Sequence, residues 1–194
     1  LLPDIDTERG NYGIKLKQIA KIYVTMFGIE KLADGERCLN WTDPKYADLG
    51  DGRRGCVGEL AEVIEEVLSK RLARDNHSST TVAQLNDLLD ALVRAPSADE
   101  GKRKLLQART LGTFSPLEHK WLCRIIVKDL KTGLGYGSVL SFLGAGAREY
   151  YDSCCDLRKT CALFAHNNPA SSAWTSQPLE PLQCFVPMLA KGLG

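Results

Sequence analysis

Apolar residues recur every three or four positions along most of this chain, and that spacing limits its fold more than any other feature. Such a period places the apolar side chains on one face of an α-helix, whereas a half-buried strand needs strict alternation of apolar and polar residues. Alternation of that kind is nearly absent from the 194 residues. We therefore predict an all-α fold, a bundle of about seven to nine helices.

Capping signals place the ends of several helices. Ser115 before Pro116, with Glu118 at the third helical position, combines an N-cap residue, a first-turn proline and a capping glutamate. Gly28 is suited to stop the first long helix, and Thr81 with Gln84 forms a capping box. The expected helices cover residues 14–26, 57–68, 81–92, 99–110, 115–131, 137–143 and 148–166.

Charge is unevenly distributed although the formal net charge is only +1. Residues 101–131 carry eight Lys or Arg against two acids, and residues 30–66 carry ten acids against five bases. We expect a basic side and an acidic side, with any anionic partner on the basic side. The seven cysteines include no C-x-x-C pair, which predicts reduced thiols and neither a zinc site nor a disulfide framework.

A row of cations follows the helix predicted to start at Ser115. Lys120, Arg124, Lys128 and Lys131 fall within an arc of about 80° if each residue turns 100°. The sequence "TGLGYGS" (132–138) comes next, so glycines and a new helix start would bring backbone N–H groups close to an anion. The competing interpretation is a plain glycine C-cap at Gly133. We predict a cationic strip that faces outward and continues into a phosphate-binding glycine turn.

The stretch "EKLADGERC" (30–38) nearly matches the K-x-D-G motif of adenylating enzymes. In that motif one residue separates the nucleophilic Lys from the Asp, whereas Leu32 and Ala33 both separate Lys31 from Asp34. One extra residue displaces an extended chain by roughly 3.3 Å and turns the side chain to the opposite face. We predict a connection between helices with an Asp-Gly turn, and no catalytic residue in the chain.

Four segments occur in an order that resembles a known family: "ERGNYGIK" (8–15), "LNDLLDAL" (85–92), "PLEHKWLCRIIVKDLKTG" (116–133) and "FVPMLA" (185–190). They resemble the N-terminal DNA-binding domain of eukaryotic ATP-dependent DNA ligases, most closely the DNA ligase IV branch. The resemblance implies a helical DNA-binding domain over residues 1–182. Residues 183–194 would then begin the connection into an adenylation domain.

The resemblance also implies a function. A domain of this family holds nicked or broken duplex DNA through the minor groove and the phosphate backbone, without sequence preference. The parent enzyme would use ATP and Mg²⁺, act in double-strand-break repair by non-homologous end joining, and reside in the nucleus. We expect no cofactor in this chain. The expected DNA contacts are Lys120, Arg124, Lys128, Lys131, Thr132, Gly133, Gly135 and Ser138, with Lys15 and Lys102 on a wider face.

The alternative function is a helical protein-docking module that recruits a DNA-repair partner. The family resemblance implies a repair nuclease on the early helices and an end-joining scaffold protein on a C-terminal region outside this chain. Exposed aromatic residues at Tyr12, Tyr23 and Phe27 would favour docking over DNA binding.

Overall fold

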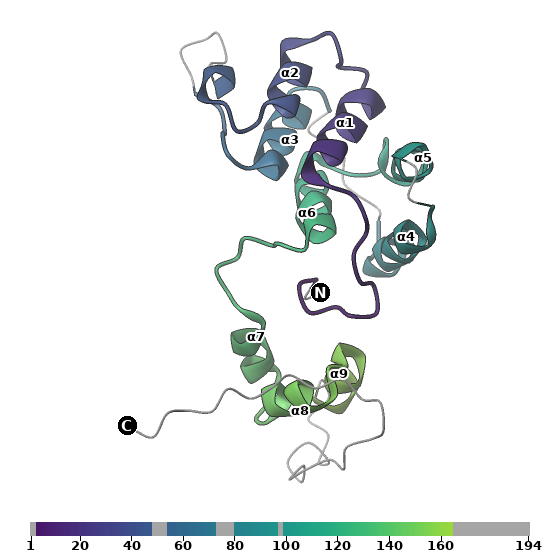
Figure 1. Cartoon of the computed structure of the whole chain (residues 1–194), viewed down its shortest axis with the longest axis vertical. Helices are drawn as coiled ribbons and strands as arrows, with labels where there is room; N and C mark the ends of the chain where they lie inside the picture. Colours follow the sequence, from purple (N-terminus) through teal and green to yellow (C-terminus); the bar gives the residue numbers. More distant parts are fainter. Residues whose placement is uncertain (1–2, 48–53, 73–79, 97–98, 165–194) are drawn as a thin grey trace. The chain divides into compact units, whose positions relative to one another are not determined.

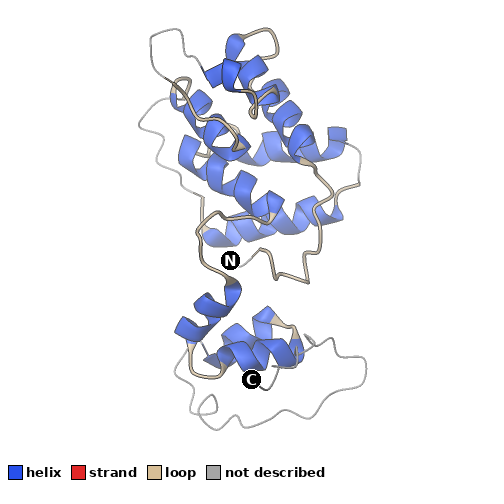
Figure 2. Cartoon of the chain, turned by 60° about the vertical axis from the view of Figure 1, so that its left-hand side comes forward, coloured by secondary structure: helices blue, strands red, loops and turns tan. Residues whose placement is uncertain are grey.

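The computed structural model of the chain describes residues 3–47, 54–72, 80–96 and 99–164, all in helices, turns and loops without a strand (Figure 2). The all-α prediction is confirmed. None of the described helices is long and apolar enough to cross a membrane. The elements are labelled in Figure 1 and have these bounds: α1 (Leu16–Met26), α2 (Ala33–Leu39), the 3₁₀ helix η1 (Pro44–Ala47), α3 (Leu60–Ser69), α4 (Val82–Arg94), α5 (Asp99–Thr110), α6 (Pro116–Val127), α7 (Tyr136–Leu143), α8 (Ala147–Cys154) and α9 (Leu157–Phe164).

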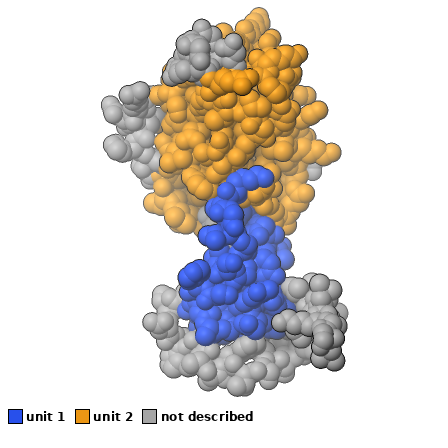
Figure 3. All heavy atoms as spheres, turned by 90° about the vertical axis from the view of Figure 1, so that its left-hand side faces the viewer, with its two compact units in different colours: residues 1–8, 131–194 blue, residues 9–130 orange. Residues whose placement is uncertain are grey.

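The chain divides into two compact units (Figure 3). Unit 2 is the continuous segment of residues 9–130, and unit 1 combines residues 1–8 with residues 131–194. The boundary between residues 130 and 131 falls inside the segment for which the sequence predicts one helix, residues 115–131, followed by a glycine turn. The predicted connection at residues 183–194 lies outside the described residues.

Unit 2 contains the main apolar core, built from the buried faces of α1, α3, α4 and α6. Helices α3 and α6 pack against each other. Their contact buries Ile64 and Leu68 together with Leu122 and Ile126, and full burial of one such aliphatic side chain contributes about 2 kcal/mol. Gly28 has a φ of 62° just after α1, as its predicted role of helix stop requires.

Unit 1 packs three short helices around a smaller cluster that includes Tyr150, Cys154 and Phe164. The sequence predicts one helix over residues 148–166, but α8 ends at Cys154 and α9 begins at Leu157. Cys155 breaks the helix because its backbone takes the left-handed conformation, with a φ of 49°. The Asp156 carboxylate then accepts the Lys159 N–H at 2.9 Å and caps α9, and residues 165–166 lie outside the described residues.

The predicted Asp-Gly turn at residues 34–35 is wrong, because both residues lie inside α2. Gly35 is buried there, and a Cβ at this position would stand 2.0 Å from the Ile29 carbonyl oxygen. The glycine therefore permits close approach of α2 to the segment that precedes it and does not form a turn. Asp34 pairs with Arg71 at 2.6 Å, so its carboxylate contributes to packing between α2 and the end of α3.

Candidate nucleic-acid interface

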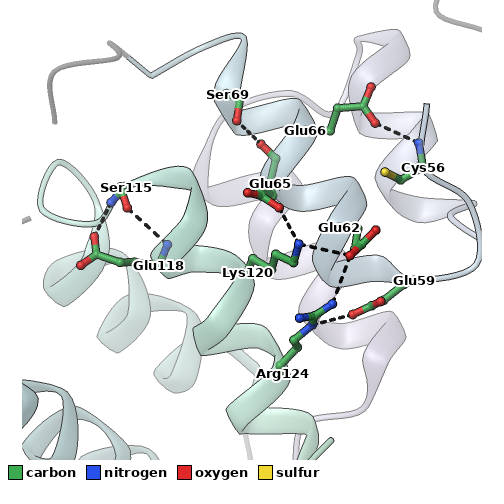
Figure 4. A network of polar contacts seen from close by, with 10 residues as sticks. All are labelled: Cys56, Glu59, Glu62, Glu65, Glu66, Ser69, Ser115, Glu118, Lys120 and Arg124. Carbon is green, nitrogen blue, oxygen red and sulfur yellow. Dashed lines mark hydrogen bonds and ion pairs between the residues drawn. The ribbon is translucent and has the colours of Figure 1, made fainter. Parts of the chain in front are cut away.

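The start of α6 has the predicted cap. The Ser115 N–H donates to the Glu118 carboxylate at 2.7 Å, and the Glu118 N–H donates to Ser115 Oγ at 3.3 Å (Figure 4). Pro116 occupies the first helical position. This capping box fixes the start of α6, and therefore the direction in which its basic residues point.

Two of those basic residues point at α3 (Figure 4). Lys120 Nζ lies 2.8 Å from Glu65 Oε2 and 3.1 Å from Glu62 Oε1. Arg124 donates from Nε to Glu59 Oε1 at 2.7 Å and from Nη2 to Glu62 Oε1 at 3.1 Å. We call these five residues the α3–α6 ion network.

The α3–α6 ion network corrects the prediction of an outward cationic strip. The side chains of Lys120 and Arg124 are only 16% and 10% exposed. The hydrogen bond from Lys120 lowers the pKa of Glu62, the bond to Glu65 raises the pKa of Lys120, and the bond to Glu59 raises the pKa of Arg124. The acidic segment packs against the basic one, so these charges neutralise each other inside unit 2 and do not form two opposite sides.

The end of α6 also differs from the prediction. The helix stops at Val127, four residues before Lys131, so Lys128 and Lys131 do not extend the row of Lys120 and Arg124. Lys128 and Lys131 have φ values of 63° and 55°, and Gly133 follows with 71°. Left-handed backbone costs a residue other than glycine roughly 1 kcal/mol, and such strain concentrates at functional sites. Lys128 is partly buried and Lys131 is exposed.

Residues 131–138, here called the 131–138 turn, form an exposed corner that leads into α7. Lys131, Thr132, Gly133, Gly135 and Ser138 are all exposed. The Thr132 hydroxyl accepts the Leu134 N–H at 3.4 Å, and Gly135 is the N-cap residue of α7. Apart from the adjoining residues of the chain, none of the described residues places an atom within 4 Å of a Cβ built on Gly133 or Gly135. A large anion such as a phosphate group can therefore approach this backbone closely.

The first turn of α7 supplies two features that suit an anion. By helix geometry the N–H groups of Tyr136 and Gly137 have no carbonyl acceptor within the helix, and the dipole adds positive potential there. The guanidinium of Arg148, from α8, lies 3.2 Å from the point where a Gly137 Cβ would stand. Sequence reasoning missed Arg148 because only the packing of α7 on α8 brings it to this turn. The one signal for Arg148 in the sequence is Gly137, whose lack of a side chain leaves room for a neighbouring one.

A turn with the same backbone pattern opens α1 in unit 2. Gly13 has a φ of 64°, Ile14 follows, and the N-cap Lys15 has φ −80° and ψ 156°. In the 131–138 turn the N-cap Gly135 has φ −74° and ψ 156°. The Asn11 side chain accepts the Gly13 N–H at 2.8 Å, and Lys15 is exposed. The two units thus each present a glycine, an apolar residue and an extended N-cap residue before a helix.

Lys102, predicted to contact DNA, is only 4% exposed. Its ammonium donates a short hydrogen bond to the Tyr12 carbonyl oxygen and lies 3.1 Å from a Cβ built on Gly13. The prediction of a surface contact is wrong for this residue. Its charge instead lies beneath the turn that opens α1.

A shallow apolar depression of about 180 Å³ lies between the start of α4 and α6. Val82, Leu85 and Trp121 are among its lining residues, and Val82 is largely exposed. The aromatic residues whose exposure would favour docking do not line it and are not exposed: Tyr12 and Tyr23 are buried and Phe27 is partly buried against the core.

Comparison with known proteins identifies the family. Residues 1–144 match the family model described as DNA ligase N terminus. The chain belongs to this DNA ligase family. It is 35% identical to DNA ligase 4 of Gallus gallus over 194 residues, which is 98% of the chain and 20% of that protein.

A second animal relative and a plant relative agree. The chain is 33% identical to DNA ligase 4 of Homo sapiens, covering 98% of the chain and 20% of that protein. It is 32% identical to DNA ligase 4 of Arabidopsis thaliana, covering 100% of the chain and 15% of that protein. The predicted resemblance to the N-terminal part of DNA ligase IV is confirmed, and the chain spans about a fifth or less of the length of these relatives.

Proposed function

We propose that this chain binds nicked or broken duplex DNA through the minor groove and the phosphate backbone, without sequence preference. Membership in the DNA ligase N-terminal family is the observation that carries the proposal. Contacts made by backbone N–H groups and by Lys or Arg to phosphates position a protein on DNA but do not read bases. The 131–138 turn offers contacts of that kind.

The contacts that support this function come from both units. In unit 1 they are Lys131, Thr132 and the N–H groups that open α7, reinforced by Arg148. In unit 2 the matching turn at Gly13–Lys15 presents the exposed Lys15 and the start of α1. Lys120 and Arg124 are assigned to the α3–α6 ion network and not to DNA.

The parent protein's role is a further part of the proposal. It is an ATP-dependent DNA ligase that acts in the nucleus, in double-strand-break repair by non-homologous end joining. ATP and Mg²⁺ would serve adenylation and phosphodiester formation in regions outside this chain. An end-joining scaffold protein would bind the parent through its C-terminal region, and a repair nuclease through early helices.

A second candidate function is protein docking, and the apolar depression between α4 and α6 favours it. Its walls combine the exposed Val82 with Trp121, whose ring lies under the Arg124 guanidinium at 5.1 Å. Aromatic and aliphatic surfaces of this kind receive side chains of a partner protein. A repair nuclease is the partner class that the ligase role suggests.

Fluorescence anisotropy with a labelled nicked duplex tests DNA binding directly. If about six phosphates are neutralised, affinity falls roughly a thousandfold between about 50 and about 200 mM salt. Affinity that does not depend on salt contradicts the proposal. A duplex of unrelated sequence is expected to bind equally well.

Two matched variants separate the turn from the ion network. Lys131→Gln removes a cation from the 131–138 turn and is expected to lower the salt slope by about 0.9. Lys120→Gln is the same chemical change on α6, but its cation already pairs with Glu62 and Glu65, so the salt slope is expected to stay unchanged. If Lys120→Gln lowers the salt slope and Lys131→Gln does not, the DNA contact lies on the face of α6 and not at the 131–138 turn.

A further inference from the structure

The outward face of α1 is basic. Lys17, Lys21 and Thr25 lie on it at spacings of four residues and are all exposed, and Lys15 stands at the N-cap. We call this set the α1 face. Helix α1 contains no Asp or Glu at all, so no carboxylate on the helix itself offsets these charges.

Two of these lysines, Lys15 at the N-cap and Lys17 in the first turn of α1, occupy electrostatically unfavourable positions in the protein alone. Cations in the first turn of a helix meet the positive end of its dipole, at a cost of roughly 0.3–1 kcal/mol each. In the first turn of α9, by contrast, nearby carboxylates offset the basic side chains. Arg158 pairs with Glu8 at 2.9 Å and Lys159 pairs with Asp156 at 3.7 Å. In the part of the chain that the structure describes, no carboxylate pairs with Lys15, Lys17 or Lys21.

The buried cation Lys102 adds to the positive electrostatic potential at the start of α1. Lys102 reaches from α5 to the backbone beneath Gly13, two residues before the N-cap Lys15. The Tyr12 carbonyl accepts its hydrogen bond, and none of the described carboxylates forms an ion pair with it. A buried charge without an opposite charge is costly in a low-dielectric interior. An external polyanion placed against this side of unit 2 would offset that cost.

We propose that the α1 face binds the sugar–phosphate backbone of one DNA strand, with Lys17 and Lys21 as phosphate contacts and Lys102 as a supporting charge. This inference rests on the proposed function and names the surface that unit 2 uses. Lys17 and Lys21 are separated by about 6 Å along the helix. That separation is close to the axial rise of about 7 Å from one phosphate to the next but one on the same strand.

The test measures binding of a labelled nicked duplex by the 194-residue chain as salt is varied. Lys17→Glu with Lys21→Glu is expected to lower the salt slope by about 1.8 and the affinity by at least about tenfold. The control is Lys31→Glu with Lys70→Glu, two exposed lysines outside the α1 face, which changes the net charge by the same amount. Circular dichroism checks that both double variants remain helical.

The outcomes distinguish the inference from the function on which it rests. Salt-dependent binding by the wild type, lost in the α1 variant and kept in the control, supports the inference. Equal binding by both double variants overturns it and leaves the proposed function standing, whereas a wild type without salt-dependent binding removes that function. Polyglutamate is the second probe and stands for an acidic protein. If the α1 variant no longer binds polyglutamate but still binds the duplex, the α1 face binds an acidic protein and not DNA. That result also overturns the inference.

Discussion

His119 makes the stability of unit 2 sensitive to mildly acidic pH. Its ring is completely buried among Tyr23, Phe27 and Phe114, with Nδ1 3.1 Å from the Tyr23 hydroxyl. Its Nε2 is buried without a hydrogen-bond partner among the described residues. Burial lowers the pKa of His119 from 6.5 to about 4, and the neighbouring Glu118 charge opposes this only in part.

The pKa shift sets the size and the sign of the effect. Because the pKa falls on folding, the unfolded chain binds the proton more tightly than the folded chain does. The stabilising contribution is therefore complete above the unfolded pKa of 6.5 and is lost as the pH falls toward 4. A fall in the pKa from 6.5 to about 4 corresponds to about 3 kcal/mol, of which about 2 kcal/mol is lost between about pH 7 and about pH 5.

Urea unfolding at several pH values measures this loss. Two of the three tryptophans, Trp41 and Trp121, lie in unit 2, so tryptophan fluorescence reports mainly its unfolding. His119→Asn keeps a polar atom near Nδ1 but does not titrate, and it is expected to be less stable than the wild type at neutral pH because the ring leaves a void. Its free energy of unfolding should change much less between about pH 7 and about pH 5. Parallel pH dependence in the two proteins would refute the reasoning.

Three further changes test the packing that supports the candidate interface. Glu66→Gln removes the carboxylate that pairs with the buried Arg37 at 2.6 Å and accepts the Cys56 N–H at 2.9 Å, so urea unfolding should show a loss of about 3 kcal/mol. Gly35→Ala drives a methyl group into the Ile29 carbonyl and should cost at least about 2 kcal/mol, whereas Gly135→Ala, at an open position, should cost well under that in the same assay. Ser115→Ala removes the cap of α6 and should lower the thermal midpoint by the equivalent of about 1 kcal/mol, and an unchanged midpoint would show that the capping box contributes nothing.

Local signals in the sequence were enough to predict most helices. The capping box at Ser115 and Glu118 predicts the start of α6, and Gly28 predicts the end of α1, because both act within one turn of the chain. Helix α2 was missed because Asp34-Gly35 has turn composition. Gly35 lies so close to the Ile29 carbonyl that a Cβ would not fit, and turn composition alone does not show this close approach.

The charges of the candidate site were predicted less well because they depend on tertiary partners. The periodicity of α6 correctly groups Lys120 with Arg124 on one face, but it cannot show that Glu59, Glu62 and Glu65 of α3 cover that face. The same limit hid Arg148, which reaches the 131–138 turn only through helix packing. The hydrogen bond that holds Lys102 to the Tyr12 carbonyl likewise joins residues 90 positions apart along the chain.

Backbone amide chemical shifts, recorded by NMR as nicked duplex is added to the chain, test the central claim most directly. The account predicts the largest changes at the amides of the 131–138 turn and at those that open α1. Changes confined to the apolar depression around Val82, Leu85 and Trp121, with both turns unaffected, would contradict it.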